Sequence, residues 1–540
     1  MQLFGKRFLL FVLALLLTAG VAFGGGSQEA GPETGGGEAE AQESSPASEE
    51  PQIAELRIGI PQEPANLNAI LISDLYSEAL AGNIYDTLVS LKEDSSDPQP
   101  LLAESWEIAD DGLTYTFNLR EGVSFHNGEA FSAEDVQYTY EQILNPDNAS
   151  PSAEFFQQIE NIVVEDEYTV RFELSSPYAA LLLAMGNPST GIIPMDTAEE
   201  MGMDELDRNP IGTGPYQFAE LVPDDRIVLE KNDDYFLTEP ALDRVVFRPI
   251  PQAETMTAEL LAGGIHIATN ILPQDIERID GRNNLNVQSV PGLSNRYLGF
   301  ADDEEPFSDV RFRRAVYHMI DFDAMVEGIW GQSGSRAYSW IPPNTLGGET
   351  DFLEEAALDY DPDRAAMLIE ELRADGVLPE DFSFTMYSVQ DPLRLRVAQA
   401  VATALREYDI DASVESPEFG TLLPLLEEGV PIYTMGWGSV PDPDRWTYRI
   451  FHSTSNRNFS QYENDRVDEL LERGRRVTDL EERRDIYHEV MEQTLATDYV
   501  HIPLVWLNQI VGVNEDVDGF EASPQGYFHL VTEERNVTLD

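Results

Sequence analysis

The 540-residue chain contains no cysteine, and this absence removes several kinds of chemistry at once. Without a thiol there is no disulfide, thiolate metal site, iron–sulfur cluster, cysteine nucleophile or lipid-carrying cysteine. Lysine is almost as scarce, because Lys6, Lys92 and Lys231 are the only three among 33 basic residues, which leaves 30 arginines. The chain therefore holds its positive charge almost entirely as guanidinium groups.

Positive charge is scarce overall, with 33 Lys and Arg against 99 Asp and Glu and a net charge of −66. Such a chain would repel nucleic acid, so we expect no nucleic-acid partner. The acids either create a field that concentrates cations at a site or form a solvated surface suited to strong salt. Because they are spread along the whole chain, we favour salt adaptation. A hydrophobic content of 42% excludes wholesale disorder, and the length predicts two or three lobes.

The N-terminus resembles a secretory signal followed by a linker. Lys6 and Arg7 precede the apolar run Phe8–Leu17, which is short for a membrane span, and small residues flank Phe23. We expect residues 1–24 to be a cleavable signal peptide, with retention as an uncleaved anchor as the alternative. Residues 25–52 are rich in Gly, Glu and Ser and predict a disordered acidic linker. The mature protein is then periplasmic or extracellular.

Strand and helix patterns alternate from Ala54 onward, which predicts a mixed α/β fold. The predicted strands are Leu56–Ile60, Phe382–Tyr387, Ala412–Val414 and Ile432–Met435, together with a hairpin of Trp106–Ile108 and Leu113–Arg120 turning at Gly112. The predicted helix starts are capping boxes at Ser132 and Thr478 and Asp-Pro pairs at Asp361 and Asp391.

Catalytic signatures are missing from the chain. There is no Gly-x-Ser-x-Gly elbow, no P-loop and no Gly-x-Gly-x-x-Gly opening a helix. The seven histidines are dispersed, and none has metal-ligand spacing. We therefore expect no enzyme activity, no metal site and no cofactor.

Aromatic residues beside glycine and proline form the most informative segment. Tyr433 lies in a predicted strand that ends at Gly436 and Trp437, and a Pro-Asp-Pro-Asp turn containing Asp442 leads to Trp446. An indole at the edge of a cleft offers a large rigid apolar face to a ligand. The alternative is that both tryptophans are core residues and that Asp442 and Asp444 are turn or cap residues.

Several motifs occur in a fixed order along the chain. They are Leu102–Glu107, Asp111–Arg120, Gly122–Gly128, Ala133–Val136, Pro210–Tyr216, Asp309–Ala315, Gly436–Trp437 and Asp465–Leu471. In this order they resemble the extracellular solute-binding proteins of family 5, the oligopeptide-, dipeptide- and nickel-binding class that serves ABC importers. The resemblance covers residues from about 56 to about 508.

The resemblance implies a two-lobed α/β periplasmic-binding-protein fold of type II, a hinged trap with a subdomain inserted in the first lobe. It places the first lobe at 53–90, 200–295 and 505–540, the inserted subdomain at 91–199 and the second lobe at 296–504. Such a protein captures a solute, closes on it and presents it to the permease subunits of an ABC transporter. We expect it to act as a monomer.

The resemblance places the Gly-Trp segment, Gly436 and Trp437, at the cleft. With Tyr433, Asp442 and Trp446 of the same aromatic segment, these residues form the ligand site that we expect. Many peptide-binding members resemble Gly-Trp-x-x-Asp, where the acid accepts the peptide ammonium, but this chain has Val440 at that position. Either Asp442 replaces the acid or the ammonium anchor is absent. A peptide is the favoured ligand, with an oligosaccharide as the alternative. A secreted hydrolase and a chemoreceptor-linked sensor are more distant alternatives.

Overall fold

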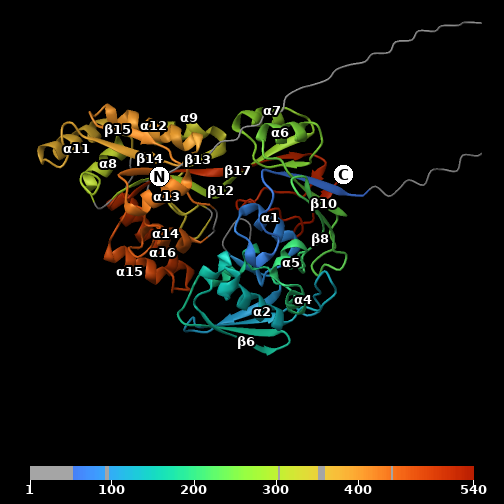
Figure 1. Ribbon diagram of the computed structural model, residues 1–540. Coiled ribbons are helices and arrows are strands. Elements are labelled where there is room, and N and C mark those ends of the chain that lie inside the picture. Colours follow the sequence, from blue (N-terminus) through green and yellow to red (C-terminus); the bar gives the residue numbers. More distant parts are fainter. Residues whose placement is uncertain (1–52, 92–96, 302–303, 344, 351–358, 439–441) are drawn as a thin grey trace, which may run out of the picture. The chain divides into compact units, whose positions relative to one another are not determined.

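The computed structural model describes residues 53–91, 97–301, 304–343, 345–350, 359–438 and 442–540 (Figure 1). Residues from Ile53 to Asp540 form one compact unit. The predicted signal peptide at 1–24 and the linker at 25–52 lie outside the described residues. The terms first lobe, inserted subdomain and second lobe denote the residue ranges that the resemblance implies.

One mixed sheet runs through both lobes in the order β15-β14-β16-β12-β17-β11-β1-β10-β9-β8, with β13 paired to β17. Its strands are β1 Glu55–Ile60, β8 Tyr216–Val222, β9 Arg226–Lys231, β10 Arg244–Pro249, β11 Ile267–Ala268, β12 Leu285–Phe300, β13 Gly334–Arg336, β14 Ser383–Ser388, β15 Asp411–Glu415, β16 Ile432–Met435 and β17 His501–Asn514. All four single strands predicted from sequence are present. The mixed α/β prediction is confirmed.

Two long antiparallel strands, β12 and β17, connect the halves of this sheet. Near Leu285, β12 pairs with the end of β17, and that end of β17 also pairs with β11. Near Phe300, β12 also pairs with β16. The ladder is irregular between Pro291 and Ser294, where a local kink becomes possible. These two strands are therefore the covalent and hydrogen-bonded link between the lobes.

A second sheet of four antiparallel strands forms the inserted subdomain, in the order β4-β5-β7-β6. Its strands are β4 Ala103–Ile108, β5 Thr114–Leu119, β6 Ile159–Asp166 and β7 Thr169–Leu174. The predicted hairpin is confirmed, because β4 pairs with β5 and Gly112 has a φ of 67° at the turn. The remaining strands are the short pairs β2 Val89–Leu91 with β3 Pro98–Pro100 and β18 Val517–Asp518 with β19 Thr538–Leu539.

The helices begin at recognisable caps. Ser132 and Asp135 form the predicted capping box, and Asp361 and Asp391 cap the helices that follow them. The prediction for Thr478 was wrong, since Asp479 is the N-cap and accepts the Glu482 amide at 2.9 Å. The α-helices are α1 Leu75–Ile84, α2 Ala133–Leu144, α3 Leu181–Met185, α4 Met195–Met201, α5 Met203–Arg208, α6 Ala253–Leu261, α7 Ile276–Asp280, α8 Val310–His318, α9 Phe322–Trp330, α11 Pro362–Ala374, α12 Pro392–Arg406, α13 Phe419–Glu428, α14 Pro443–Phe451, α15 Asp465–Gly474 and α16 Leu480–Met491. No helix within the described ranges is long and apolar enough to cross a membrane.

The buried apolar side chains fall into clusters that follow the two lobes. The largest combines residues between Leu56 and Ile267 with residues between Val511 and Val537. Two others lie between Tyr297 and Val505. This partition supports the predicted lobes, whose boundaries stay predictions.

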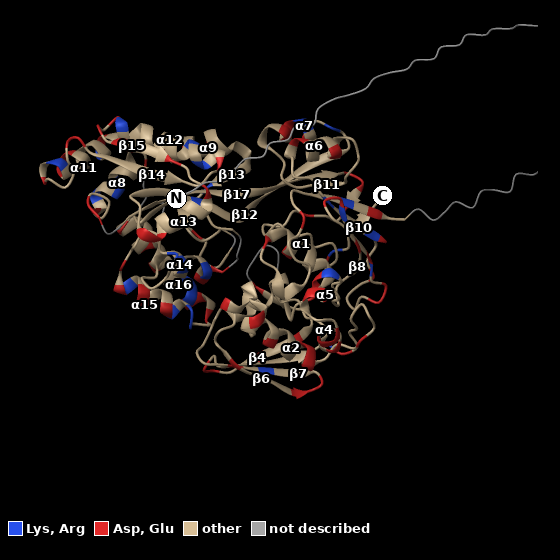
Figure 2. Cartoon of the chain, viewed as in Figure 1, with Lys and Arg blue, Asp and Glu red and all other residues tan. Residues whose placement is uncertain are grey.

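Charged residues are distributed over the elements of both lobes (Figure 2). Acidic residues lie on α4, α5 and α7 and on the strands of the inserted subdomain, and acidic and basic residues alternate on second-lobe helices such as α16. The acids do not gather around one site in this view. The distribution is compatible with salt adaptation, which stays a prediction.

The motif Pro210–Tyr216 owes its glycines to a close approach of two backbones. A Cβ at Gly212 would lie 2.2 Å from the Ile84 carbonyl oxygen, and a Cβ at Gly214 would lie 2.6 Å from the same atom. Glycine is therefore required at both positions. Between them, Thr213 donates to Asp86 at 2.8 Å, and Tyr235 donates to the same carboxylate at 2.9 Å. The motif thus anchors the end of α1 through a buried acid.

Burial raises the pKa of Asp86 to about 6, although its two hydroxyl donors lower it. The folded state then takes up a proton at a higher pH than the unfolded chain, whose value is 3.8. This carboxyl adds stability below about pH 4, and that contribution is lost as the pH rises through about 6.

We predict that the free energy of unfolding of the wild type, minus that of Asp86→Asn, falls by up to about 3 kcal/mol between pH 4 and pH 7. Urea unfolding of both proteins across this range measures the difference. A difference that does not change with pH would contradict the assignment.

Candidate functional site

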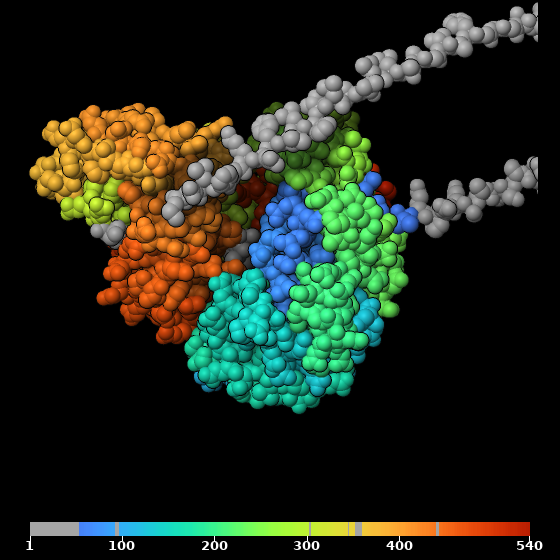
Figure 3. All heavy atoms as spheres, in the orientation of Figure 1, coloured from blue at the N-terminus to red at the C-terminus, as the bar shows by residue number. Residues whose placement is uncertain are grey.

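Three cavities meet between the lobes and share wall residues. The Arg445 pocket has a volume of about 110 Å³, the Trp437 pocket about 300 Å³ and the Arg296 pocket about 290 Å³. Glu78 and Arg445 line the first two, and Tyr527 lines the Arg445 and Arg296 pockets. We call the three together the cleft. Figure 3 shows a hollow between the orange surface of the second lobe and the blue surface of residues near α1.

Helix α14 forms the second-lobe wall of the cleft. Asp442 caps it by accepting the Asp444 amide at 2.8 Å, and Pro443 occupies the first turn, where its missing N–H costs nothing. This start directs Arg445 and Arg449 toward the inserted subdomain. The Arg445 guanidinium lies 4.1 Å from the ring centroid of Phe155, a cation–π contact.

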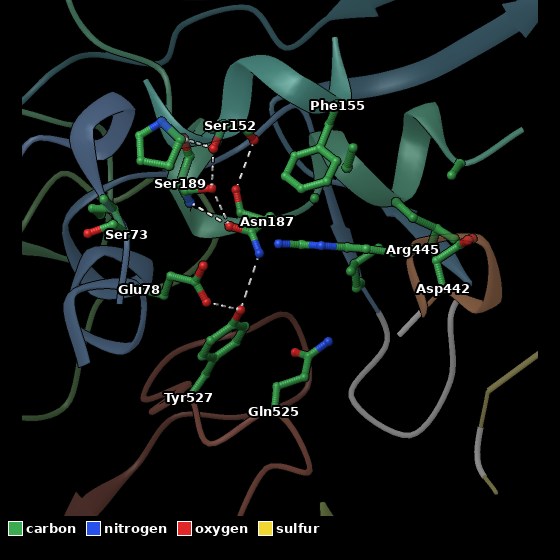
Figure 4. A pocket seen from close by; sticks show the side chains of 18 of the residues that line it. Ser73, Glu78, Ser152, Phe155, Asn187, Ser189, Asp442, Arg445, Gln525 and Tyr527 are labelled. Atoms are coloured by element: carbon green, nitrogen blue, oxygen red, sulfur yellow. Dashed lines mark hydrogen bonds between the residues drawn. The ribbon is translucent and has the colours of Figure 1, made fainter. Parts of the chain in front are cut away.

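Opposite charges face each other in the Arg445 pocket (Figure 4). Glu78 of α1 accepts a hydrogen bond from the Tyr527 hydroxyl at 2.7 Å, and burial raises the pKa of its carboxyl. Burial and the neighbouring Arg449 lower the pKa of Arg445, and Glu154 and Glu78 oppose that effect. The Arg445 pocket thus places an acid and a base on facing walls, and neither of them is fully solvated.

The predicted residues Gly436 and Trp437 lie beside the Trp437 pocket. A Cβ at Gly436 would lie 2.4 Å from the Asn295 carbonyl oxygen, so the backbone there admits only glycine. The Trp437 carbonyl accepts the Asn295 amide at 3.1 Å, and its half-buried indole stacks on Phe459 at 6.4 Å between centroids. Trp437 itself lines the cavity. Its contact with ligand stays a prediction that this position supports.

The structure does not bring Tyr433 to the cleft, and we withdraw it from the candidate site. Its side chain is fully buried, and its hydroxyl hydrogen-bonds with the Ser460 hydroxyl at 3.0 Å and with His501 Nε2 at 3.2 Å. The side chains of a central strand alternate between its two faces, and Tyr433 is on a core face. Trp446 is 3% exposed and contributes only to the wall of the Trp437 pocket.

Asp442 has a partner that leaves it little capacity for a ligand. Arg483 donates two hydrogen bonds to its carboxylate, at 2.8 Å and 2.9 Å, and both side chains are at most 4% exposed. The Asp444 amide takes a third acceptor position. Asp442 lines the Arg445 pocket, but its carboxylate is taken up by these partners, so the structure favours the cap alternative. That Asp442 replaces the ammonium-binding acid stays a prediction.

The lobes are also in direct contact beside the cleft. Arg449 donates to both carboxylate oxygens of Glu154 at 2.6 Å and 2.7 Å, and the Ala179 amide donates to the Arg475 carbonyl at 2.8 Å. These bonds join the inserted subdomain to α14 and the end of α15. They hold the wall that carries Arg445 against the wall that carries Phe155.

Sequence reasoning missed most of the Arg445 pocket. Glu78, Asn187, Gln525 and Tyr527 come from segments far apart in the chain, and nothing in their local patterns marks them. Arg445 did carry a signal, because it is the basic residue of the Pro-Asp-Pro-Asp-Arg-Trp segment next to Trp437. Among the described residues, no group of three or more His, Asp or Glu side chains could hold a metal ion.

Comparison with known proteins places this geometry in a family. Residues 97–458 match the family described as bacterial extracellular solute-binding proteins, family 5 (middle). The chain belongs to this family.

The dipeptide-binding protein of Escherichia coli K12 is 28% identical over 85% of this chain and 89% of its own length. The heme-binding protein A of Haemophilus influenzae is 27% identical over 85% of this chain and 88% of its own length. The solved structure of the ABC transporter-associated periplasmic binding protein DppA from Helicobacter pylori, in complex with the peptide STSA, is 28% identical, covers 90% of this chain and 98% of that chain, and has a TM-score of 0.73.

The fold is accordingly the two-lobed α/β fold of the family 5 binding proteins, as the motifs predicted. Members are binding components of solute transport, so the prediction that this chain is not an enzyme is confirmed.

We predict that Asp442→Asn lowers the free energy of unfolding of the ligand-free protein by about 3–5 kcal/mol, because it leaves Arg483 buried without a counter-charge. Asp485→Asn is the matched control, since its pair with Arg484 is exposed and worth at most about 1 kcal/mol. Urea unfolding compares the two variants. Equal stabilities would refute the structural role of Asp442.

Proposed function

We propose that this chain is the binding component of an ABC importer that captures a short peptide outside the cytoplasmic membrane and delivers it to the permease subunits. The observation that carries the proposal is the cleft itself. It combines an indole face at Trp437 with a base and an acid, Arg445 and Glu78, in adjoining cavities. A peptide presents matching groups, namely side chains, a carboxylate and an ammonium.

The known ligands of relatives point in the same direction without deciding it. Two of the three relatives are named for dipeptide binding or are in complex with a peptide, and one is named for heme. Heme iron is held in proteins by His, Cys, Met or Tyr. The three cavities are lined by no His or Met of the described chain, the sequence has no cysteine, and Tyr527, which lines two of the cavities, donates its hydroxyl to Glu78. These observations favour a peptide over heme.

The two connecting strands supply a means of capture. A ligand drives closure only if it binds the closed form more tightly than the open form. Residues on both sides of the cleft, Glu78 on the first lobe and Arg445 and Trp437 on the second, would be brought against the ligand together. The irregular ladder at Pro291–Ser294 is a natural place for the rotation.

The position of the protein in the cell follows from the same proposal. The family is extracellular by its description, and residues 1–24 have the pattern of a cleavable signal peptide. We propose export, removal of the signal and action as a monomer at the permease.

We predict that Trp437→Ala weakens peptide binding more than tenfold, because the indole is a large apolar face that the ligand buries. Calorimetry with short peptides, after a thermal-shift screen of peptides, oligosaccharides and nickel chelates at low and high salt, measures this. Trp106→Ala is the control: this half-buried indole packs on Phe117 in the inserted subdomain, away from the cleft. Tight binding of an oligosaccharide with no binding of any peptide would overturn the proposal.

A further inference from the structure

The Arg445 pocket is a small side chamber of the cleft with its own polar lining. Its volume of about 110 Å³ holds several water-sized groups, since one water needs about 10–15 Å³. The inserted subdomain contributes Phe155 and Asn187, the first lobe contributes Glu78 and Gln525, and the second lobe contributes Arg445. A group in this chamber would therefore touch all three parts of the fold.

Arg445 reaches into the chamber without a polar partner. In the part of the chain that the structure describes, its guanidinium makes no hydrogen bond and no ion pair. It lies over the face of Phe155, and Glu154 and Glu78 act on it only as charges at longer range. Figure 4 shows the side chain extending past Phe155 toward Asn187. Five N–H donors in a fixed fork are thus presented to the cavity. Burial lowers the pKa of Arg445, so an anion in the chamber would stabilise its charged form.

The acids nearest to Arg445 have other partners. Glu154 accepts both of its hydrogen bonds from Arg449, and Asp442 accepts two from Arg483. Glu78 faces the same chamber and accepts from Tyr527. Within the described ranges the protein therefore supplies no carboxylate that pairs with Arg445, although Arg449 on the next turn of the same helix has one.

A second side chain points to the same ligand chemistry. Gln525 is only 6% exposed, and within the described ranges its side-chain amide makes no hydrogen bond. A turn fixes its backbone, because the backbone N–H of Gln525 donates to the Ser523 hydroxyl at 3.2 Å and Gly526 has a φ of 81°. Figure 4 shows the amide group directed into the chamber below Arg445. Its NH₂ adds a neutral donor beside the guanidinium.

We propose that the Arg445 pocket is a carboxylate subsite that selects acidic peptides: Arg445 pairs with the carboxylate of an Asp or Glu side chain of the ligand, and the Gln525 amide donates to the same group. This inference rests on the proposed peptide function and adds a substrate class to it. Guanidinium and carboxylate match in a bidentate geometry. Glu78, on the facing wall, would accept from an N–H of the ligand rather than from the carboxylate.

A carboxylate can also come from the C-terminus of a peptide, and the experiment separates the two sources. The probes are alanine tripeptides with one Glu or one Gln at each position in turn, each as the free acid and as the C-terminal amide. Affinities are measured by calorimetry for the full-length exported protein, for Arg445→Gln and for Arg457→Gln. Arg457 pairs with Glu427 and lines none of the three cavities, so its variant removes the same charge elsewhere.

We expect the wild type to bind its best Glu tripeptide about 10- to 100-fold more tightly than the Gln counterpart, whether or not the C-terminus is amidated. Arg445→Gln should abolish this preference while still binding the Gln tripeptides, which shows that the variant is folded. Arg457→Gln should retain the preference. A loss of affinity on amidation that disappears in Arg445→Gln would support the subsite with the terminal carboxylate as its occupant.

Two results would overturn the inference, and they differ. If peptides bind but Arg445→Gln changes neither the Glu preference nor the effect of amidation, the carboxylate subsite is wrong and the peptide function stands. If neither these tripeptides nor any other short peptide of the thermal-shift screen binds the wild type, the proposed function fails and the inference fails with it.

Discussion

The β12–β17 ladder is the constraint on which the rest of the molecule depends. These strands cross from one lobe to the other, and each end of the pair is extended by further strands of its own lobe. The sheet is therefore continuous, while the buried apolar clusters on either side of the crossing are separate. A continuous backbone with divided cores permits rotation of one lobe against the other, because bending two strands disturbs little apolar packing. This arrangement supports the proposed capture by closure.

The position of the cleft residues depends on a second interaction, the buried pair of Asp442 and Arg483. Arg483 belongs to α16 and Asp442 caps α14, so the pair fixes the start of one helix against the other. The direction of α14 in turn decides where Arg445 and Arg449 point. Displacing either partner of a buried ion pair leaves a charge uncompensated, which is strongly destabilising. Here the pair orients the wall that carries Arg445.

Local patterns in the sequence predicted the elements well and the site only in part. The hairpin at Gly112 and strand β16 carry short-range signals, namely a turn residue and a run of β-formers, and both were predicted correctly. Whether Tyr433 faces the core or the cleft depends on which face of β16 is covered, and tertiary packing decides that. The role of Asp442 likewise depends on Arg483, 41 residues later in the chain.

Residues of the Arg445 pocket could not be found from local patterns, because Glu78, Asn187 and Gln525 meet only after the three parts of the fold assemble. The composition of the chain nevertheless bears on how the unpaired Arg445 is interpreted. With 99 acids for 33 bases, an arginine has about three candidate partners within the protein itself. The neighbouring arginines follow this expectation, since Arg449, Arg475 and Arg483 each pair with an acid. The Arg445 guanidinium pairs with no acid of the described chain, although the protein is so acidic and an aromatic face keeps this group partly from water. A partner that arrives with the ligand therefore explains it better than a shortage of partners in the chain.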